Sequence, residues 1–319
     1  MAIYSLGSAL IFGMTLQAIF ATGEVFQGAL APWPRADGTD VIATRVNSIL
    51  PELTGRAMGS FAQPIPLGIF AAATGVVSFA LYLVARRASY LYGACVSAFV
   101  LVLSGTRSAV LAMLVATAYI LLRSFRMSRL PLYALVTIAI LGFVIAIDLP
   151  SALGLGGIQS TASYTHRAAT IMSIGEALSE PFGSVFFGHG YENVVGLFAS
   201  GTIGGTDQIT VPDNEYFRTF LGAGFVGFAL LLGSVIRSLR HAAASSGALV
   251  VVVAISLFTF DGLGWNSVAT LFYFALGAAA ASSSRLAVRR SGGLVGSKSV
   301  DALIVTGDAT QPSRRQGLC

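Results

Sequence analysis

The chain has 319 residues, of which 55% are hydrophobic and 10% are charged, and its formal net charge is +5. Soluble domains usually contain about 25% charged residues, so this composition excludes a water-soluble globular protein and predicts an integral membrane protein. The apolar runs are long and continuous, which favours membrane-spanning helices over barrel strands. The positive charge then reflects arginines beside cytoplasmic helix ends, with no need for a nucleic-acid partner.

Taken in chain order, the apolar runs predict eight membrane spans, because a helix needs about 20 apolar residues to cross a bilayer. They cover residues 3–20, 64–85, 88–106, 108–122, 131–149, 216–236, 247–260 and 267–283. The predicted fold class is therefore all-α, a polytopic membrane domain over residues 1–284 with about eight transmembrane helices. The first segment has no basic residue before it and no clear cleavage site after it, so we interpret it as a span and not as a signal peptide. Residues 285–319, rich in Ser, Gly and Arg, are predicted to form a disordered cytoplasmic tail.

The interval 88–122 has two interpretations, a single long tilted helix or a hairpin of two helices with Arg107 at its turn. A single crossing would place Arg86 and Arg87 on the opposite side of the membrane from Arg123 and the arginines that follow it. A hairpin places all of these arginines on one side, together with those that follow the later spans. Because arginines cluster in short cytoplasmic loops, we predict the hairpin, with Arg107 at its outer end.

Two long outer segments remain, at about residues 21–63 and 150–215, and both carry Gly, Pro and charge. Loops of this length are usually functional, so we expect any chemistry there. Cys95 and Cys319 lie on separated segments, which predicts no disulfide. The sequence has no CxxC, HExxH or Walker pattern, so we expect neither a metal nor a nucleotide cofactor.

The second outer segment contains a predicted amphipathic helix over residues 163–181. Arg167, Ile171, Ile174 and Leu178 recur there at helical spacing on one face. Such a helix lies along the membrane surface, with Arg167 directed towards lipid headgroups or a pocket. Snorkelling of Arg167 to a lipid phosphate is the structural alternative.

Further along, His189 and the group Asp213, Glu215 and Arg218 stand near the mouth of the sixth span. Each has a structural alternative to a role in chemistry. Asp213 could cap the following helix, Glu215 and Arg218 could form an ordinary surface pair, and His189 could fill a tight loop between glycines. Arg107 could pair with a lipid phosphate or a neighbouring carboxylate.

The order of these features resembles a family of bacterial membrane glycan transferases that includes O-antigen ligases and O-antigen polymerases. The residues that carry the resemblance are GRAMGSFAQPIPLGIF (55–70), SGTRSAVLAML (104–114), HRAATIMSIGEAL (166–178), PFGSVFFGHGYENV (181–194) and DNEYFRTFLGAGFVGFALLL (213–232). It covers about the last half to two-thirds of a typical member, and members usually have several more spans before the GRAMGSF-like stretch. A compact variant, a start assigned inside a longer gene and a degenerate remnant all fit this difference.

The resemblance implies transfer of a glycan from an undecaprenyl diphosphate carrier to an acceptor hydroxyl, with inversion, at the outer face of the cytoplasmic membrane. Arg107 and Arg167 match the family's two arginines regarded as diphosphate contacts. Asp213 occupies the position where the ligases often have the histidine taken as catalytic base. Forked guanidinium groups suit a diphosphate leaving group, and we add Arg218 as a third candidate for binding it.

A carboxylate can replace imidazole as the proton acceptor, so Asp213 is the leading candidate base, followed by His189 and Glu215. No metal or other cofactor is needed if the arginines supply the positive charge. The predicted function is polymerisation of lipid-linked repeat units of a surface polysaccharide or exopolysaccharide, in the bacterial inner membrane, with a partner membrane subunit or a second copy completing the helices. The alternatives are an O-antigen ligase acting on lipid A core, a non-enzymatic transporter or channel, and a truncated, inactive remnant.

Overall fold

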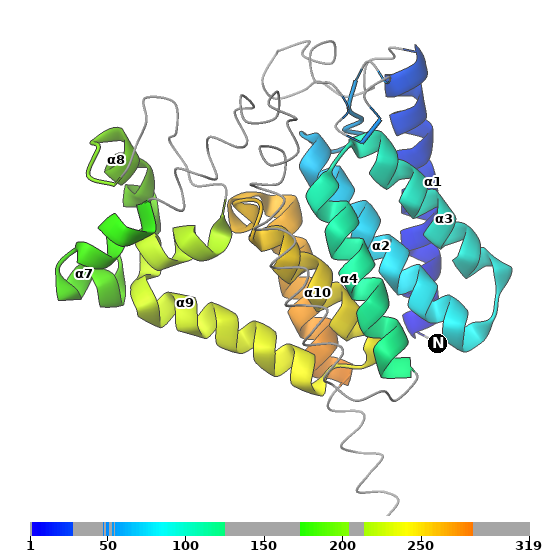
Figure 1. The fold of residues 1–319 in the computed structure, drawn as a ribbon. Coiled ribbons are helices and arrows are strands. Elements are labelled where there is room, and N and C mark those ends of the chain that lie inside the picture. The colour runs from blue at the N-terminus through cyan, green and yellow to red at the C-terminus, as the bar shows by residue number, and fades with distance from the viewer. Residues whose placement is uncertain are drawn as a thin grey trace, which may run out of the picture.

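The computed structural model describes residues 2–27, 47, 49–50, 53, 55–124, 173–203 and 214–282, and the regular secondary structure of these residues is helical throughout. The long helices are α1 (Ala2–Gln27), α2 (Pro64–Ala85), α3 (Ala88–Ser104), α4 (Arg107–Ser124), α9 (Glu215–His241) and α10 (Ala244–Leu257) (Figure 1). A further long helix, Asn266–Ser282, follows α10. The short ones are α7 (Phe182–Phe187), η2 (Tyr191–Asn193), α8 (Val194–Ala199), η3 (Gly262–Gly264) and a helical segment over residues 173–179.

Four helical segments are long and apolar enough to cross a membrane: Ser5–Phe26, Pro64–Ala85, Arg107–Ser124 and Glu215–His241. The helices Ala88–Ser104, Ala244–Leu257 and Asn266–Ser282 are apolar but shorter. The chain is therefore an all-α, membrane-embedded protein. The predicted span 131–149 lies outside the described residues, and the total of eight crossings stays a prediction.

Helix α2 begins and ends where the sequence predicts. Pro64 stands at its start, where proline's missing N–H costs nothing. Its end is set by Arg86, which adopts a left-handed conformation with φ 54° and donates its backbone N–H to the carbonyl of Tyr82 at 2.8 Å. The turn of Arg86 and Arg87 then leads directly into α3.

The interval 88–122 folds as the predicted hairpin and not as one long helix. Helix α3 ends at Ser104, and Gly105, with φ 62°, donates its N–H to the carbonyl of Val102 at 3.1 Å. A left-handed residue after a helix is usually glycine, because a Cβ is strained there. Helix α4 then begins at Arg107, so this arginine lies at the tip of the hairpin.

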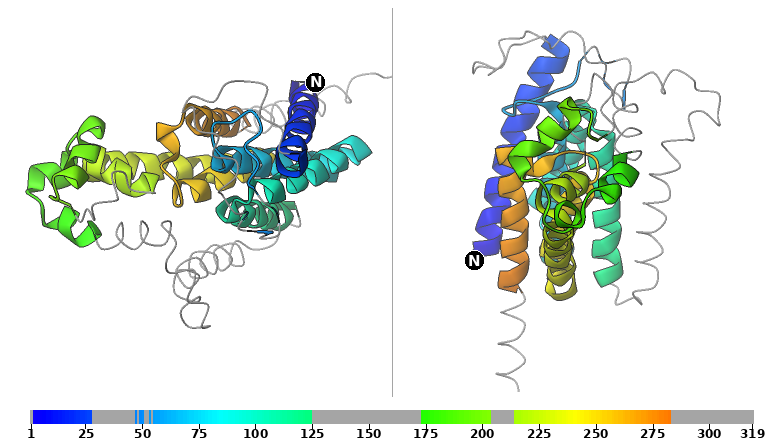
Figure 2. Two further views of the ribbon diagram at one scale, coloured as in Figure 1. Left: turned by 90° about the horizontal axis from the view of Figure 1, so that it is seen from above. Right: turned by 90° about the vertical axis from the view of Figure 1, so that its left-hand side faces the viewer.

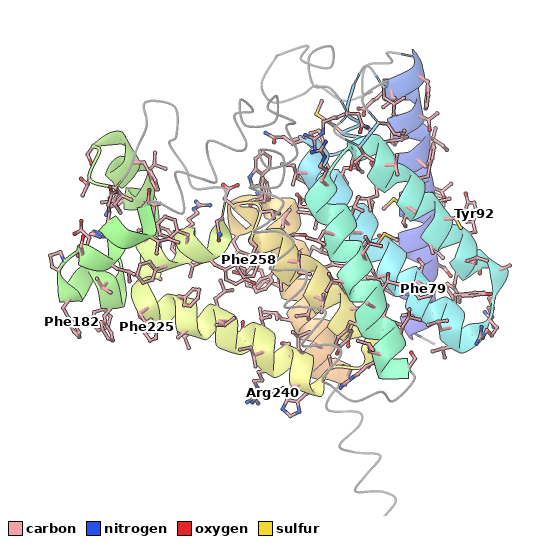
Figure 3. The ribbon with its side chains drawn as sticks, in the orientation of Figure 1. Phe79, Tyr92, Phe182, Phe225, Arg240 and Phe258 are labelled. Carbon is pink, nitrogen blue, oxygen red and sulfur yellow. The ribbon has the colours of Figure 1, made fainter. Side chains whose placement is uncertain are left out.

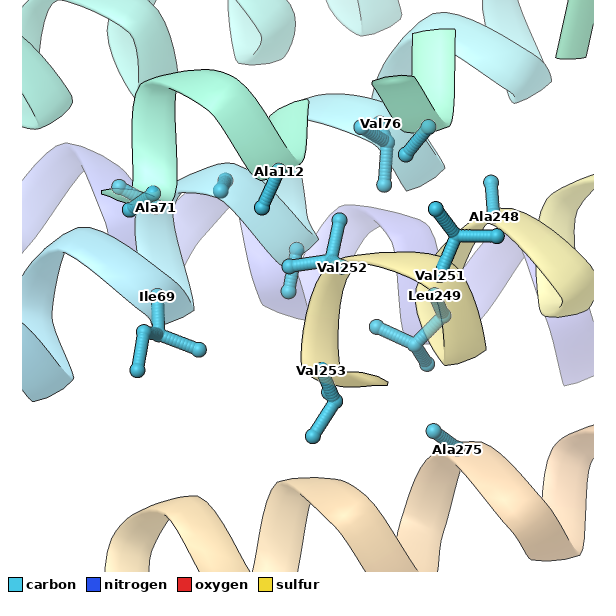
Figure 4. Packing of buried hydrophobic residues seen from close by; sticks show 14 of the residues in the cluster. Ile69, Ala71, Val76, Ala112, Ala248, Leu249, Val251, Val252, Val253 and Ala275 are labelled. Carbon is cyan, nitrogen blue, oxygen red and sulfur yellow. The ribbon is translucent and has the colours of Figure 1, made fainter. Parts of the chain in front are cut away.

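The main core lies where α2 packs between α3, α4 and α10. Figure 4 shows its small and branched side chains, with Ile69, Ala71 and Val76 of α2 close to Ala112 of α4 and Val252 of α10. Small residues let helix backbones approach closely, which is how helices associate when no water is present to drive them together. This core fixes the positions of the helix ends that carry the polar groups.

Two helices differ most from their predicted bounds. Helix α1, predicted to end at residue 20, continues to Gln27 and so brings Glu24 into a helix. Helix α9 extends beyond the predicted 216–236 on both sides but is interrupted at Gly224, which has φ 68° and ψ −168°. Its two halves form a V with Gly224 at the apex (Figure 1). The left view of Figure 2 shows α7 and α8 at this end of α9, far from α1.

A second, smaller core lies beyond the bend of α9. Its buried residues are Ala177, Val194, Phe198, Ile203, Phe217 and Leu221. They come from residues 173–203 and from the first half of α9, residues 215–223, and we call these two segments together the outer unit. The described part of the second outer segment thus has short helices and a core of its own.

Most arginines of the described residues lie at one end of the long helices, and the acidic residues do not lie there. Arg86, Arg87, Arg123, Arg237, Arg240 and His241 stand at the end where α2, α4 and α9 finish, which we call the basic end. Arg123 ties two of these helices together by donating from Nη2 to the carbonyl of Ala242 at 2.9 Å, and Figure 3 shows Arg240 at this end. The acidic residues of the described chain, Glu24, Glu176, Glu180, Glu192, Glu215 and Asp261, lie elsewhere, at the opposite, loop end or in the outer unit.

Candidate functional site

A first polar cluster surrounds the turn of the α3–α4 hairpin at the loop end. Arg56 donates from Nε to the carbonyl of Ser104 at 2.9 Å and from Nη2 to Thr106 Oγ1 at 3.1 Å. The buried Asn47 donates from Nδ2 to the carbonyls of Val102 and Leu103, at 3.0 and 3.2 Å. The last carbonyls of a helix lack partners within it and carry partial negative charge, so a guanidinium and an amide stabilise them well.

The segment before α2 is fixed between this turn and α1. The buried carboxylate of Glu24 accepts hydrogen bonds from the backbone N–H groups of Met58 and Gly59, at 2.7 and 2.9 Å. Gln17 donates from Nε2 to Ser60 Oγ at 2.6 Å and accepts from the Ser60 N–H at 2.8 Å. The GRAMGS stretch is therefore bound on both sides, which holds Arg56 in place.

Arg107 is exposed at the first turn of α4, next to Thr106, which Arg56 contacts. The carbonyl of Thr106 accepts from the N–H groups of Ala109 and Val110, at 3.1 and 3.2 Å, and so starts the helix. The turn between α3 and α4 thus combines a bound arginine, Arg56, with a second arginine, Arg107, at the positive end of the α4 helix dipole. Arg56 was not among the predicted site residues, although an arginine in a polar stretch directly before a span was a usable signal.

A second polar cluster lies at the start of α9. Glu215 is fully buried, with 0% of its surface exposed. Its Oε2 accepts from the N–H of Leu263 at 2.9 Å, and its Oε1 accepts from Thr219 Oγ1 at 3.4 Å. Tyr191 in turn donates its hydroxyl to Thr219 Oγ1 at 2.8 Å. Partial burial of the hydroxyl raises the pKa of Tyr191, which keeps this donor protonated.

Arg218 pairs with Asp261 and not with Glu215. Its Nη1 lies 3.6 Å from Asp261 Oδ2, its guanidinium carbon lies 5.8 Å from the centre of the Tyr191 ring, and Trp265 Nε1 donates to Asp261 Oδ1 at 3.2 Å. The prediction of a surface pair between Glu215 and Arg218 was wrong, because Glu215 points inward to the backbone of η3. The start of α9 is thereby joined to the segment after α10.

His189 stands in the turn that supports the bend of α9. The backbone N–H of His189 donates to the carbonyl of Leu221 at 2.9 Å, and the backbone N–H of Gly190 donates to the carbonyl of Gly222 at 2.8 Å. Carbonyls one turn before a helix break are the ones that lose their ordinary partners, and the turn of His189 supplies substitutes. A Cβ at Gly224 would collide with the carbonyl of Phe186, so the bend also needs a glycine where α7 touches it.

Of the other predicted site residues, Arg167 and Asp213 lie outside the described residues. The N-cap of α9 is Asn214, whose Oδ1 accepts from the N–H of Phe217 at 3.2 Å. In the described part of the predicted amphipathic helix, Ala177 is buried while Ile174 and Leu178 are 41% and 58% exposed. The apolar stripe that Arg167 was predicted to share therefore faces away from the protein at these two positions.

No group of three or more His, Cys, Asp and Glu side chains that could hold a metal ion occurs in the part of the chain that the structure describes. No protein-family model matches the chain, and no curated protein matches its sequence.

Proposed function

We propose that the chain is a multi-pass membrane glycosyltransferase that polymerises undecaprenyl-diphosphate-linked repeat units of a surface polysaccharide or exopolysaccharide. One observation carries the proposal: Arg107 begins α4 at the tip of the α3–α4 hairpin, directly after Thr106, which accepts a hydrogen bond from Arg56, at the loop end of the helices. Arginine-rich helix ends face the cytoplasm in most membrane proteins, so the loop end faces outward, in the cytoplasmic membrane of a bacterium. Carrier-linked glycans are assembled on that side by the family that the sequence resembles.

The proposed chemistry uses the residue types gathered at this end. The acceptor hydroxyl attacks the anomeric carbon, the bond from that carbon to the diphosphate oxygen breaks, and the diphosphate leaves with the electron pair. Arg107, together with Arg167, binds the negative charge that develops on the leaving group. Asp213, directly before the cap of α9, accepts the proton of the hydroxyl, with His189 and Glu215 as the other candidate bases and Arg218 as a further diphosphate contact. The burial of Glu215 makes it the least accessible of the three bases.

The position of the charges favours an enzyme over a transporter. Transporters place ionisable residues near the middle of the membrane, often in broken helices. Here α2, α3 and α10 contain no charged residue, and the two arginines of α4 stand at its first residue and in its last turn. Helix α9 is broken at Gly224, but its charged residues also stand near its two ends and not at the break. An O-antigen ligase differs from a polymerase in its acceptor, so the distinction between the two depends on the product.

The proposal is tested by the profile of carrier-linked glycans in a host strain that lacks the gene. The strain is complemented, at equal membrane abundance, with the wild-type protein, Arg107→Ala or Arg107→Lys, and with Arg240→Ala as a matched control from the basic end. We expect single repeat units to accumulate with both Arg107 variants, since lysine lacks the planar fork, and normal chains with the control. Full-length chains with Arg107→Lys would refute the bidentate contact, and an unchanged profile without the gene would refute polymerisation. Long chains that remain on the carrier without the gene would identify a ligase.

The orientation is tested separately by fusing a topology reporter after Arg129 or after Gly201. We expect a cytoplasmic signal from the first fusion and an external signal from the second. The opposite result would place the basic end outside and the turn that bears Arg107 in the cytoplasm, which contradicts the proposed function.

A further inference from the structure

Helix α7 carries a group of aromatic side chains that the protein leaves uncovered. Phe182 and Phe187 are 71% and 69% exposed. Phe182 stacks on Phe186 with their ring centres 4.2 Å apart, and Phe186 lies 5.9 Å from Phe225 of α9. Figure 3 shows Phe182 and Phe225 side by side at the apex of the bent helix.

This group continues the lipid-facing surface of a membrane span. On the second half of α9, a candidate span, Phe225 and Leu230 are 52% and 70% exposed. Exposed apolar side chains on a span face lipid. Because Phe186 packs against Phe225, the aromatic side chains of α7 extend the same surface sideways.

The length of α9 limits how far α7 can stand above the membrane. From Gly224 to Arg237 a helix rises about 20 Å, and from Gly224 to the end of α9 about 26 Å, whereas the hydrocarbon core of a bilayer is about 30 Å thick. With Arg237 at the level of the inner headgroups, the bend and the helix packed on it reach no higher than the outer part of the bilayer. Any tilt of α9 lowers them further.

The backbone of α7 suits such a position. Its six residues, FGSVFF, contain no charge, and Pro181 before it has no N–H to satisfy. Three N–H groups at its ends find partners within the protein: Ser184 and Val185 donate to the carbonyl of Pro181, and Gly188 donates to that of Ser184. Internal pairing of backbone groups is the main requirement for a segment in contact with lipid.

We infer that α7 is an interfacial membrane helix, with the side chains of Phe182 and Phe187 inserted among the lipid acyl chains of one leaflet. Glu180, directly before Pro181, then marks the level of the headgroups. Phenylalanine is typical of the lipid-facing side of helices that lie in the membrane interface. The lipid contact holds the outer unit against the bilayer and so fixes the height of the His189 turn. This inference needs only the membrane and does not depend on the proposed reaction.

The test measures collisions of a spin label with oxygen, which concentrates in lipid, and with a water-soluble nickel chelate. Cys95 and Cys319 are replaced by serine, and single labels are placed by Phe182→Cys, Phe187→Cys, Leu230→Cys or Val195→Cys. The full chain is reconstituted in vesicles of phosphatidylethanolamine and phosphatidylglycerol. Leu230 reports the lipid-facing side of α9. Val195, 43% exposed on α8, is the control from the same unit, and Figure 1 shows α8 farther from the basic end than α7.

We expect oxygen collisions to exceed chelate collisions at positions 182, 187 and 230, and the reverse at position 195. All four native side chains are exposed, so the labels replace no buried contact. Chelate collisions at 182 and 187 as frequent as at 195 would overturn the inference, because α7 would then stand in water. Shielding from both reagents would also overturn it and would indicate a protein partner; spin–spin broadening would identify that partner as a second copy.

Discussion

The bundle of α1–α4 and α10 and the outer unit are stabilised in different ways. The bundle has a large core of small and branched residues, and its polar segments are bound by buried side chains such as Glu24 and Asn47. The outer unit has a core of six buried residues, and several of its large apolar side chains are exposed. It is joined to the bundle through the second half of α9 and by Glu215, which accepts from the N–H of Leu263. The comparison indicates that the outer unit can be released without unfolding the bundle.

The largest expected effect comes from Gly224→Ala. The left-handed backbone and the carbonyl of Phe186 leave no room for a methyl group, so strain and overpacking should cost about 3 kcal/mol or more. We expect rapid proteolysis within residues 173–203 while the thermal unfolding of the bundle in detergent changes little.

The matched control is Gly233→Ala on the same helix, where an added Cβ meets nothing within 4 Å. It should leave the proteolysis rate unchanged. Equal protection of residues 173–203 in Gly224→Ala and the wild type would show that the bend does not hold the outer unit.

The bundle side of the comparison is tested by Glu24→Ala. The substitution removes the acceptor of two backbone N–H groups in a buried place, which should cost about 2–3 kcal/mol. We expect the unfolding temperature of the whole chain to fall, in contrast to Gly224→Ala. The exposed Glu192→Ala serves as control and should have almost no effect. Release of residues 173–203 alone by Glu24→Ala would contradict the division into two regions.

The joint between the regions is tested by Glu215→Ala. Leu263 and Thr219 lose their acceptor, and the cost should be about 1–2 kcal/mol. Because Glu215 connects the outer unit to η3, we expect proteolysis of residues 173–203 and bundle unfolding to change together, each by a moderate amount. A change in only one of the two would place Glu215 in that region and not at the joint.

The local patterns of the sequence predicted the bundle well. Proline at residue 64 fits the start of α2. The paired arginines at the end of α2 and the one-sided distribution of arginine predicted the hairpin at Arg107. Each of these signals acts within a few residues or through the rule for charge at membranes. The length of the first helix and the bend of α9 were not predicted. Both involve partners far along the chain. Glu24, in the extension of α1, accepts from the N–H of Met58, and Gly224, at the bend of α9, lies against the carbonyl of Phe186.

The candidate site was predictable to a smaller extent. Arg107 at a hairpin tip and His189 in a tight turn follow from local sequence. The role of Arg56 depends on carbonyls that only the fold brings to it, and the inward orientation of Glu215 depends on Leu263, 48 residues away. A pattern in one sequence does not indicate such pairings, and helical spacing alone favoured the wrong partner for Arg218.

The smallest expected effect is that of Asn214→Ala at the start of α9. The side chain caps the helix by accepting from the N–H of Phe217, and the loss of such a cap costs about 1 kcal/mol. Asn214→Asp keeps an acceptor and adds a charge that the helix dipole favours, so it should restore the unfolding temperature. Because Asn214 begins the helix that bears Arg218, the pair also separates two effects of position 214 on glycan polymerisation. If Asn214→Asp restores stability and polymerisation together, the cap acts through helix order; if it restores stability alone, the amide group itself contributes to the site next to Asp213.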